Sequence, residues 1–129
     1  MKIQFGLSQD EMAVLREAIA SVTSRSFNSL VNDYRLLVQS LDGYAFSIYD
    51  YDNDLSPRVT LSQALKKCSP EIQSKVSSGL RSLDMLFEER TTLVKRSFDN
   101  GEPESDLWYS RLPARPGREL QDDIDSGNL

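Results

Sequence analysis

The regular spacing of apolar residues between positions 27 and 41 constrains the fold of this chain more than any other feature. Apolar residues recur there at intervals of three and four, which places them on one face of a helix. The residues with this spacing are Phe27, Leu30, Val31, Tyr34, Leu37, Val38 and Leu41. Asp42-Gly43 follows and is a typical helix stop. The pattern predicts a helix over residues 27–42 that needs another apolar surface to cover it.

Other segments carry the same periodicity and clear start signals. Ser8 and Glu11 form a capping-box pattern, and Ser69-Pro70-Glu71 supplies an N-cap, a proline at the first helical position and an acid in the first turn. Thr60 is the expected N-cap of a short helix. The helices predicted in addition span residues 9–25, 61–68 and 70–99. Gly79 falls within the apolar stripe of the longest one, which suggests that another backbone approaches closely there.

The sequence thus predicts a mainly α fold, a small bundle of three principal helices plus one short helix. Met1–Phe5 and 44–49 alternate weakly between apolar and polar residues and could pair as a minor two-stranded β ribbon. We expect residues 1–101 to form the helical bundle domain and residues 102–129 to form an acidic, proline-containing tail. A length of 129 residues suffices for one core of this kind.

The tail cannot form a core of its own, since it holds seven carboxylates against three arginines and few aliphatic residues. Leu107-Trp108-Tyr109 nevertheless form an apolar cluster that would be costly to leave in water. We expect the tail to be irregular and partly packed on the bundle, with residues after about 118 loose. Trp108 is either the anchor of this packing or an interface residue.

The composition argues against most catalytic chemistry. The chain has no histidine and a single cysteine, Cys68, which excludes imidazole catalysis and the usual zinc and iron–sulfur sites. It also lacks the glycine patterns that bind dinucleotides or phosphates. We expect a protein that is not an enzyme and has no cofactor.

The charge of the chain indicates the sign of its partner. A net charge of −5 argues against binding to nucleic acid or anionic lipid, and it fits a basic protein. No apolar run approaches the roughly 20 residues that span a bilayer, and no secretory signal is recognisable. We expect a cytoplasmic protein. The basic residues Arg58, Lys66-Lys67 and Lys95-Arg96 are expected on solvated helix faces.

The stretch from Tyr49 to Asp54 is the strongest candidate site. It reads Tyr49-Asp50-Tyr51-Asp52-Asn53-Asp54, and it is predicted to lie in a loop over residues 50–57. Clustered carboxylates gain nothing from burial, and tyrosines add rigid contact area at little entropic cost. The candidate partner-binding residues are Tyr49, Asp50, Tyr51, Asp52, Asp54 and Trp108.

Three aspartates at alternate positions also resemble the start of a calcium-binding EF-hand loop. The match fails because Leu55 stands where the loop needs glycine and Leu61 where it needs a bidentate glutamate. No metal site is therefore predicted. A loop that is merely solvated remains the alternative to a partner contact.

These features favour a small acidic binding protein that neutralises or inhibits a basic partner, such as a toxin-like effector or nuclease, in the manner of an immunity protein or antitoxin. A second acidic run, Asp122-Asp123-Ile124-Asp125, would add to the attraction. The alternative is a helical adaptor or homo-oligomerisation module without an inhibitory role. We expect a monomer or a weak homodimer.

Overall fold

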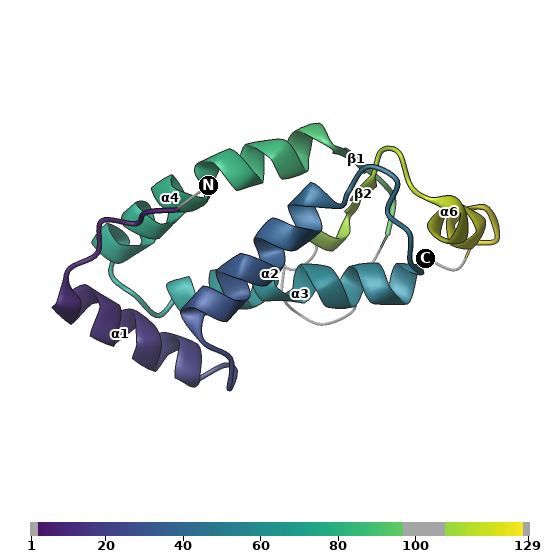
Figure 1. Ribbon diagram of the computed structural model, residues 1–129. Helices are drawn as coiled ribbons and strands as arrows, with labels where there is room; N and C mark the ends of the chain where they lie inside the picture. Colours follow the sequence, from purple (N-terminus) through teal and green to yellow (C-terminus); the bar gives the residue numbers. More distant parts are fainter. Residues whose placement is uncertain (1–2, 97–107, 128–129) are drawn as a thin grey trace.

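The computed structural model describes residues 3–96 and 108–127. Within these ranges the chain is mainly helical with a small antiparallel sheet (Figure 1), which confirms the predicted fold class. The elements in chain order are α1 (Gln9–Ala20), α2 (Phe27–Gln39), α3 (Ile48–Leu65), α4 (Pro70–Glu89), β1 (Thr91–Leu93), β2 (Arg111–Pro113) and α6 (Arg118–Asp125).

The apolar stripe of α2 lies at the centre of the core. Its residues from Phe27 to Val38 are buried as the spacing predicts. α2 packs against both α3 and α4, and α1 packs against α3 (Figure 1). The buried residues form one cluster to which α1, α2, α3, α4, β2 and α6 all contribute. The fold is therefore a helical bundle with one continuous core.

The predicted starts of α1 and α4 are confirmed. Ser8 and Glu11 form a complete capping box on α1, and Ser69 caps α4 with Pro70 in its first turn. A Cβ at Gly79 would overlap the Phe5 ring, and the Gln4 carbonyl oxygen would lie only 3.0 Å away. The N-terminal segment thus crosses α4 closely at its glycine.

The prediction of a loop over residues 50–57 and a separate helix over 61–68 is wrong. Residues 50–57 and 61–65 belong to α3, which begins at Ile48 and continues to Leu65. Ser47 and Asp50 close a capping box at its N-terminus, and this satisfies two backbone N–H groups that would otherwise lack partners. Thr60 lies inside the helix and caps nothing.

Pro57 interrupts the hydrogen bonding of α3 without ending it. A proline has no backbone N–H, so the Asn53 carbonyl loses its helical donor. The Ser56 hydroxyl donates to that carbonyl at 2.7 Å instead. Pro57 itself is buried. A side chain of the same helix thus replaces the missing backbone bond, and the helix runs through the proline.

α4 ends at Glu89, well before the predicted end at residue 99. The next residues include the β-branched pair Thr91-Thr92, which suits a strand better than a helix. β1 pairs antiparallel with β2, with Thr91 opposite Pro113. The β ribbon therefore lies between β1 and β2, whereas the described residues of the predicted pair, 3–5 and 44–49, form no strand. The predicted helix stop at Asn100-Gly101 and the predicted domain boundary at 101–102 lie outside the described residues.

The C-terminal segment packs on the bundle through Leu112 and Leu120, which are almost fully buried. The expectation that residues after about 118 are loose is wrong, because α6 forms there. Its start is fixed by a hydrogen bond of 2.8 Å from the Gly117 N–H to the Tyr44 carbonyl. A Cβ at Gly117 would collide with the backbone at Gly43 and Tyr44, so only glycine fits this contact.

The described part of the chain has neither a membrane-spanning helix nor a cluster of metal-binding side chains. None of its helices has both the length and the apolar character needed to cross a membrane. Nor do its cysteine and acidic side chains gather into a group of three or more that could hold a metal ion.

Candidate protein-binding face

α3 distributes the six residues from Tyr49 to Asp54 around a helix, so they do not act as one site. Tyr51 points into the core and is 0% exposed. Its hydroxyl donates to the Arg111 carbonyl at 2.7 Å, and burial, with a smaller effect of the Asp52 charge, raises its pKa above the usual value for tyrosine. The prediction that Tyr51 faces a partner is therefore wrong.

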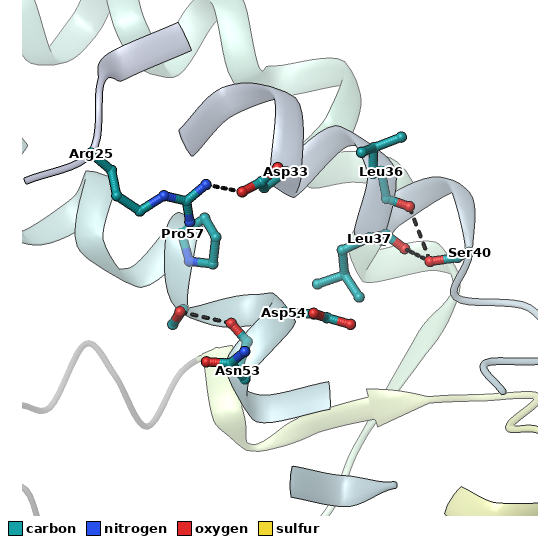
Figure 2. Close-up of a pocket in the computed structure, with 9 residues that line it drawn as sticks. Arg25, Asp33, Leu36, Leu37, Ser40, Asn53, Asp54 and Pro57 are labelled. Carbon is teal, nitrogen blue, oxygen red and sulfur yellow. Dashed lines mark hydrogen bonds and ion pairs between the residues drawn. The ribbon is translucent and has the colours of Figure 1, made fainter. Parts of the chain in front are cut away.

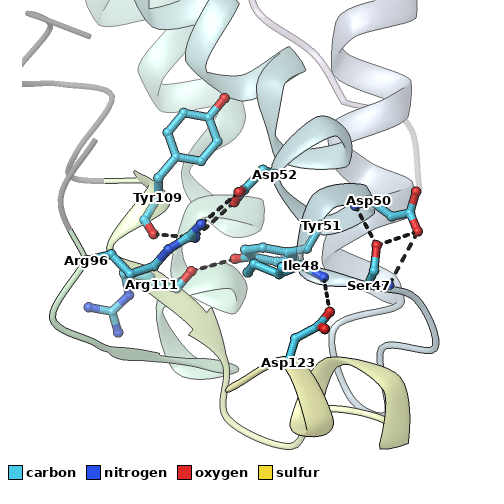
Figure 3. Close-up of polar contacts among 9 residues, drawn as sticks. All are labelled: Ser47, Ile48, Asp50, Tyr51, Asp52, Arg96, Tyr109, Arg111 and Asp123. Carbon is cyan, nitrogen blue, oxygen red and sulfur yellow. Dashed lines mark hydrogen bonds and ion pairs between the residues drawn. The ribbon is translucent and has the colours of Figure 1, made fainter. Parts of the chain in front are cut away.

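Asp52 is bonded within the chain, to Arg96. The Arg96 guanidinium donates to both of its carboxylate oxygens, at 2.9 and 2.7 Å. The Arg96 side chain is only 3% exposed, so the expectation that this arginine is solvated is wrong. Figure 3 shows Asp52 and Asp50 on opposite sides of α3. Asp52 fastens α3 to the segment after β1, and both of its oxygens are already bonded to an arginine of the same chain.

Asp50 has a local role and remains exposed. Its carboxylate accepts from the Ser47 N–H at 3.3 Å and from the Ser47 hydroxyl at 2.8 Å. The negative charge stands at the N-terminus of α3, where the helix dipole favours it. Asp50 is therefore held in a fixed position while its charge faces the solvent.

Asp54 is exposed as well, one turn further along α3. One of its oxygens accepts a short hydrogen bond of 2.5 Å from the Tyr44 hydroxyl. Burial raises the pKa of Tyr44, and the bond to Asp54 raises it further. Tyr44 therefore remains a donor at neutral pH and fixes the orientation of this carboxylate.

Four residues of α3 share one solvent-exposed side, which we call the outer face: Tyr49, Asp50, Asn53 and Asp54. Their spacing of one, three and one residues brings them onto neighbouring turns of a helix. Tyr49 is 85% exposed, an unusual state for a large ring. Phe46, just before the helix, is 56% exposed and adds a second ring. The outer face thus combines carboxylates with aromatic surface.

α6 brings a second group of carboxylates to the N-terminal end of α3 (Figures 1 and 3). Asp123 accepts from the Ile48 N–H at 2.9 Å and so joins the two helices. The exposed carboxylates of α6 are Glu119, Asp122 and Asp125. We call these three residues the acidic end. The acidic run at 122–125 is visible in the sequence, whereas its position beside α3 follows only from the fold.

Trp108 lies elsewhere, in a cluster on the inner side of α3. The Arg58 guanidinium stacks over its ring at 4.3 Å, and its ring centroid lies 5.3 Å from that of Phe87. These contacts give Trp108 the anchoring role, the structural one of the two considered, and separate it from the outer face.

An ion pair between a buried arginine and a partly exposed aspartate in this cluster has no counterpart in the sequence-based expectations. Arg58, expected on a solvated face, is 6% exposed and donates to both oxygens of Asp84 at 3.1 and 3.0 Å. The Tyr34 hydroxyl donates to the same carboxylate at 2.7 Å. Nothing in the sequence pairs positions 58 and 84. The only available hint is the helical register of α3, which puts Arg58 on the side of Tyr51 and Leu55.

The arrangement offers surface chemistry: fixed negative charges, exposed rings and a rigid helix that carries them. Comparisons with known proteins add no further assignment. The chain matches no protein-family model, no curated protein and no solved structure.

Proposed function

We propose that this protein binds a basic protein through the outer face of α3 and the acidic end of α6, and that binding neutralises or inhibits the partner. The observation that carries this proposal is the exposure of Tyr49, 85%, beside the carboxylates of Asp50 and Asp54 on one side of a helix. An exposed aromatic ring flanked by charges of one sign suits an interface with a surface of the opposite sign.

The two components have different effects on binding. Carboxylates steer a cationic partner toward the face and raise the association rate, an effect that salt screens. The Tyr49 ring supplies contact area and excludes water from the neighbouring charge pairs, which slows dissociation. Because the face lies on a capped helix, little conformational entropy is lost when the partner binds.

A basic effector such as a nuclease is the class of partner that we favour. A protein that acts on nucleic acid needs a cationic surface to contact phosphates, and a compact acidic protein seated on that surface blocks access. Immunity proteins and antitoxins act in this way. The net charge of −5 on the present chain agrees in sign with such a partner.

Affinity capture from the native cell, followed by quantitative mass spectrometry, tests the proposal. The full chain is compared with a variant that carries Tyr49→Ala, Asp122→Asn and Asp125→Asn. The control is Glu17→Gln, which removes an exposed charge from α1. We expect wild type and control to capture a basic protein with a pI above about 9, and the variant to lose it by about tenfold or more. Equal capture by the variant, or an acidic captured protein, would contradict the proposal.

A further inference from the structure

A hollow of about 330 Å³ lies between α2 and α3, where the outer face ends (Figure 2). Asn53 and Asp54 belong both to the outer face and to the lining of this hollow. Leu36 and Leu37 of α2 form its apolar wall together with Pro57. The hollow is thus continuous with the surface that we propose for the partner, and it has both a charged and an apolar side.

The charge of the lining favours a cation. Arg25 is the lining residue with a positive charge, and its guanidinium contacts the Asp33 carboxylate and donates to the Ser29 hydroxyl at 2.8 Å. That pair is neutral as a unit. Because Asp54 is the third charged residue of the lining, the hollow carries a net charge of one carboxylate. Tyr44 donates to one oxygen of the Asp54 carboxylate. Within the described residues, the other oxygen accepts no hydrogen bond.

The helix interruption at Pro57 adds a second acceptor. The Asn53 carbonyl has lost its usual helical donor, the N–H of residue 57, and accepts from the Ser56 hydroxyl at 2.7 Å. A carbonyl oxygen has two lone pairs, so it can accept a further bond. Ser56 and Pro57 both line the hollow, which places this carbonyl at its edge. A donor-rich group can therefore be met by Asp54 and by the backbone of Asn53 together.

The apolar wall defines what must carry that group. Leu36 is 49% exposed although it is a large aliphatic residue, and Pro57 lies across the hollow from it (Figure 2). A short aliphatic stem laid on Leu36 would cover this exposed apolar surface. An arginine has such a stem, and its planar guanidinium can donate to two acceptors at once.

We infer that the hollow between α2 and α3 receives an arginine side chain of the basic partner. The guanidinium bonds to Asp54 and the Asn53 carbonyl, and the stem lies on Leu36. The source of the arginine rests on the proposed function, whereas the chemistry of the hollow does not. A lysine fits less well, because its ammonium is a compact charge that is costlier to dehydrate.

Titration of the ¹⁵N-labelled full chain with N-acetyl-L-arginine amide, followed by NMR, tests this inference. We expect saturable chemical-shift changes in the amides of Leu36, Asn53 and Asp54. N-acetyl-L-citrulline amide has nearly the same shape without the charge, and we expect its affinity to be lower by about tenfold or more. Asp54→Asn should weaken the binding of the arginine amide by a similar factor, while Glu17→Gln should leave that binding unchanged.

A second variant covers the case in which Asp54→Asn disturbs the contact with Tyr44. Leu36→Lys places a positive charge at the exposed wall without touching that contact, and it should abolish binding of arginine amide. The inference is overturned if the shifts are absent, if citrulline amide binds equally well, or if Leu36→Lys binds as the wild type does.

The capture experiment above uses variants at Tyr49, Asp122 and Asp125, none of which lines the hollow. The two results are therefore distinguishable. Capture of a basic partner without binding of arginine amide would remove the hollow from the account. Binding of arginine amide without capture of a basic partner would remove the partner as its source.

Discussion

Arg96 donates two parallel hydrogen bonds, of 2.9 and 2.7 Å, to the carboxylate of Asp52 and so connects the middle of α3 to the segment after β1. This ion pair distinguishes Asp52 from Asp50 and Asp54, which stand two positions before and after it in the sequence. Asp50 caps a helix and faces solvent, Asp52 joins two parts of the fold, and Asp54 is oriented by Tyr44. Three aspartates at alternate positions of the sequence therefore have separate roles.

Asp52→Ala should destabilise the protein without changing its association with a basic partner. The substitution leaves the Arg96 guanidinium, 3% exposed, without its carboxylate. Loss of one partner of a buried pair costs about 3 kcal/mol or more. Urea unfolding measures the free energy of unfolding, with Glu17→Ala as the control for loss of an exposed acid. An unchanged unfolding midpoint would show that the pair contributes nothing.

Asp84→Ala should have a similar cost, about 3 kcal/mol, because it leaves Arg58 buried without a counter-charge and removes the acceptor of the Tyr34 hydroxyl. Trp108 is the single tryptophan of the chain and stacks on Arg58, so its fluorescence should change in the folded variant. Glu88→Ala, on the exposed side of α4, should change stability by less than about 0.5 kcal/mol. Equal effects of the two variants would contradict the role of the pair.

Gly79→Ala should destabilise the protein, although alanine in place of glycine usually stabilises a helix by about 1 kcal/mol. The added Cβ overlaps the Phe5 ring, and the Gln4 carbonyl at 3.0 Å limits any shift of the segment. Thermal unfolding checks the sign. Ser78→Ala, at an exposed neighbouring position, should be neutral or slightly stabilising. A rise in the melting temperature of Gly79→Ala would mean that the N-terminal segment does not pack there.

The tyrosines should make the protein unfold in alkali. Burial raises the pKa of Tyr34, Tyr44 and Tyr51 above the usual value of 10.0, and the acceptors Asp84 and Asp54 raise the first two further. A raised pKa in the folded state stabilises the protein below the pKa of the unfolded chain, and this stability is lost as the pH rises above it.

Absorbance of the phenolate during a pH titration measures this effect. We expect these three of the five tyrosines to ionise only together with the loss of the circular dichroism signal, at a pH above about 10. Reversible ionisation of all five tyrosines in the folded protein would contradict the burial of Tyr34, Tyr44 and Tyr51.

The parts of the fold that depend on local signals could be predicted from the sequence. Ser8 with Glu11 and Ser69 with Pro70 mark helix starts through contacts within one turn, and the stripe of α2 follows from its period. The start of α3 carries a signal of the same kind in Ser47 and Asp50. Pro57 argues against a continuous helix in this segment, because a proline inside a helix usually breaks it.

The candidate site could be predicted only in part, because the residues that share one side of the segment differ between a helix and an extended chain. An extended segment presents alternate residues, which would group Asp50, Asp52 and Asp54 on one side. A helix groups residues three and four apart, and so separates Asp52 from the other two. Its partner Arg96 is 44 positions away, and such a tertiary contact leaves no mark on the local sequence.

The most direct test of the acidic and aromatic face is the association rate of the captured basic partner, measured by stopped-flow mixing at low and high salt. Replacement of Asp122 and Asp125 by Asn should slow association at low salt by about tenfold, and the difference should disappear near 1 M salt. Tyr49→Ala should mainly speed dissociation. Association rates equal to that of the wild type at every salt concentration would contradict the account.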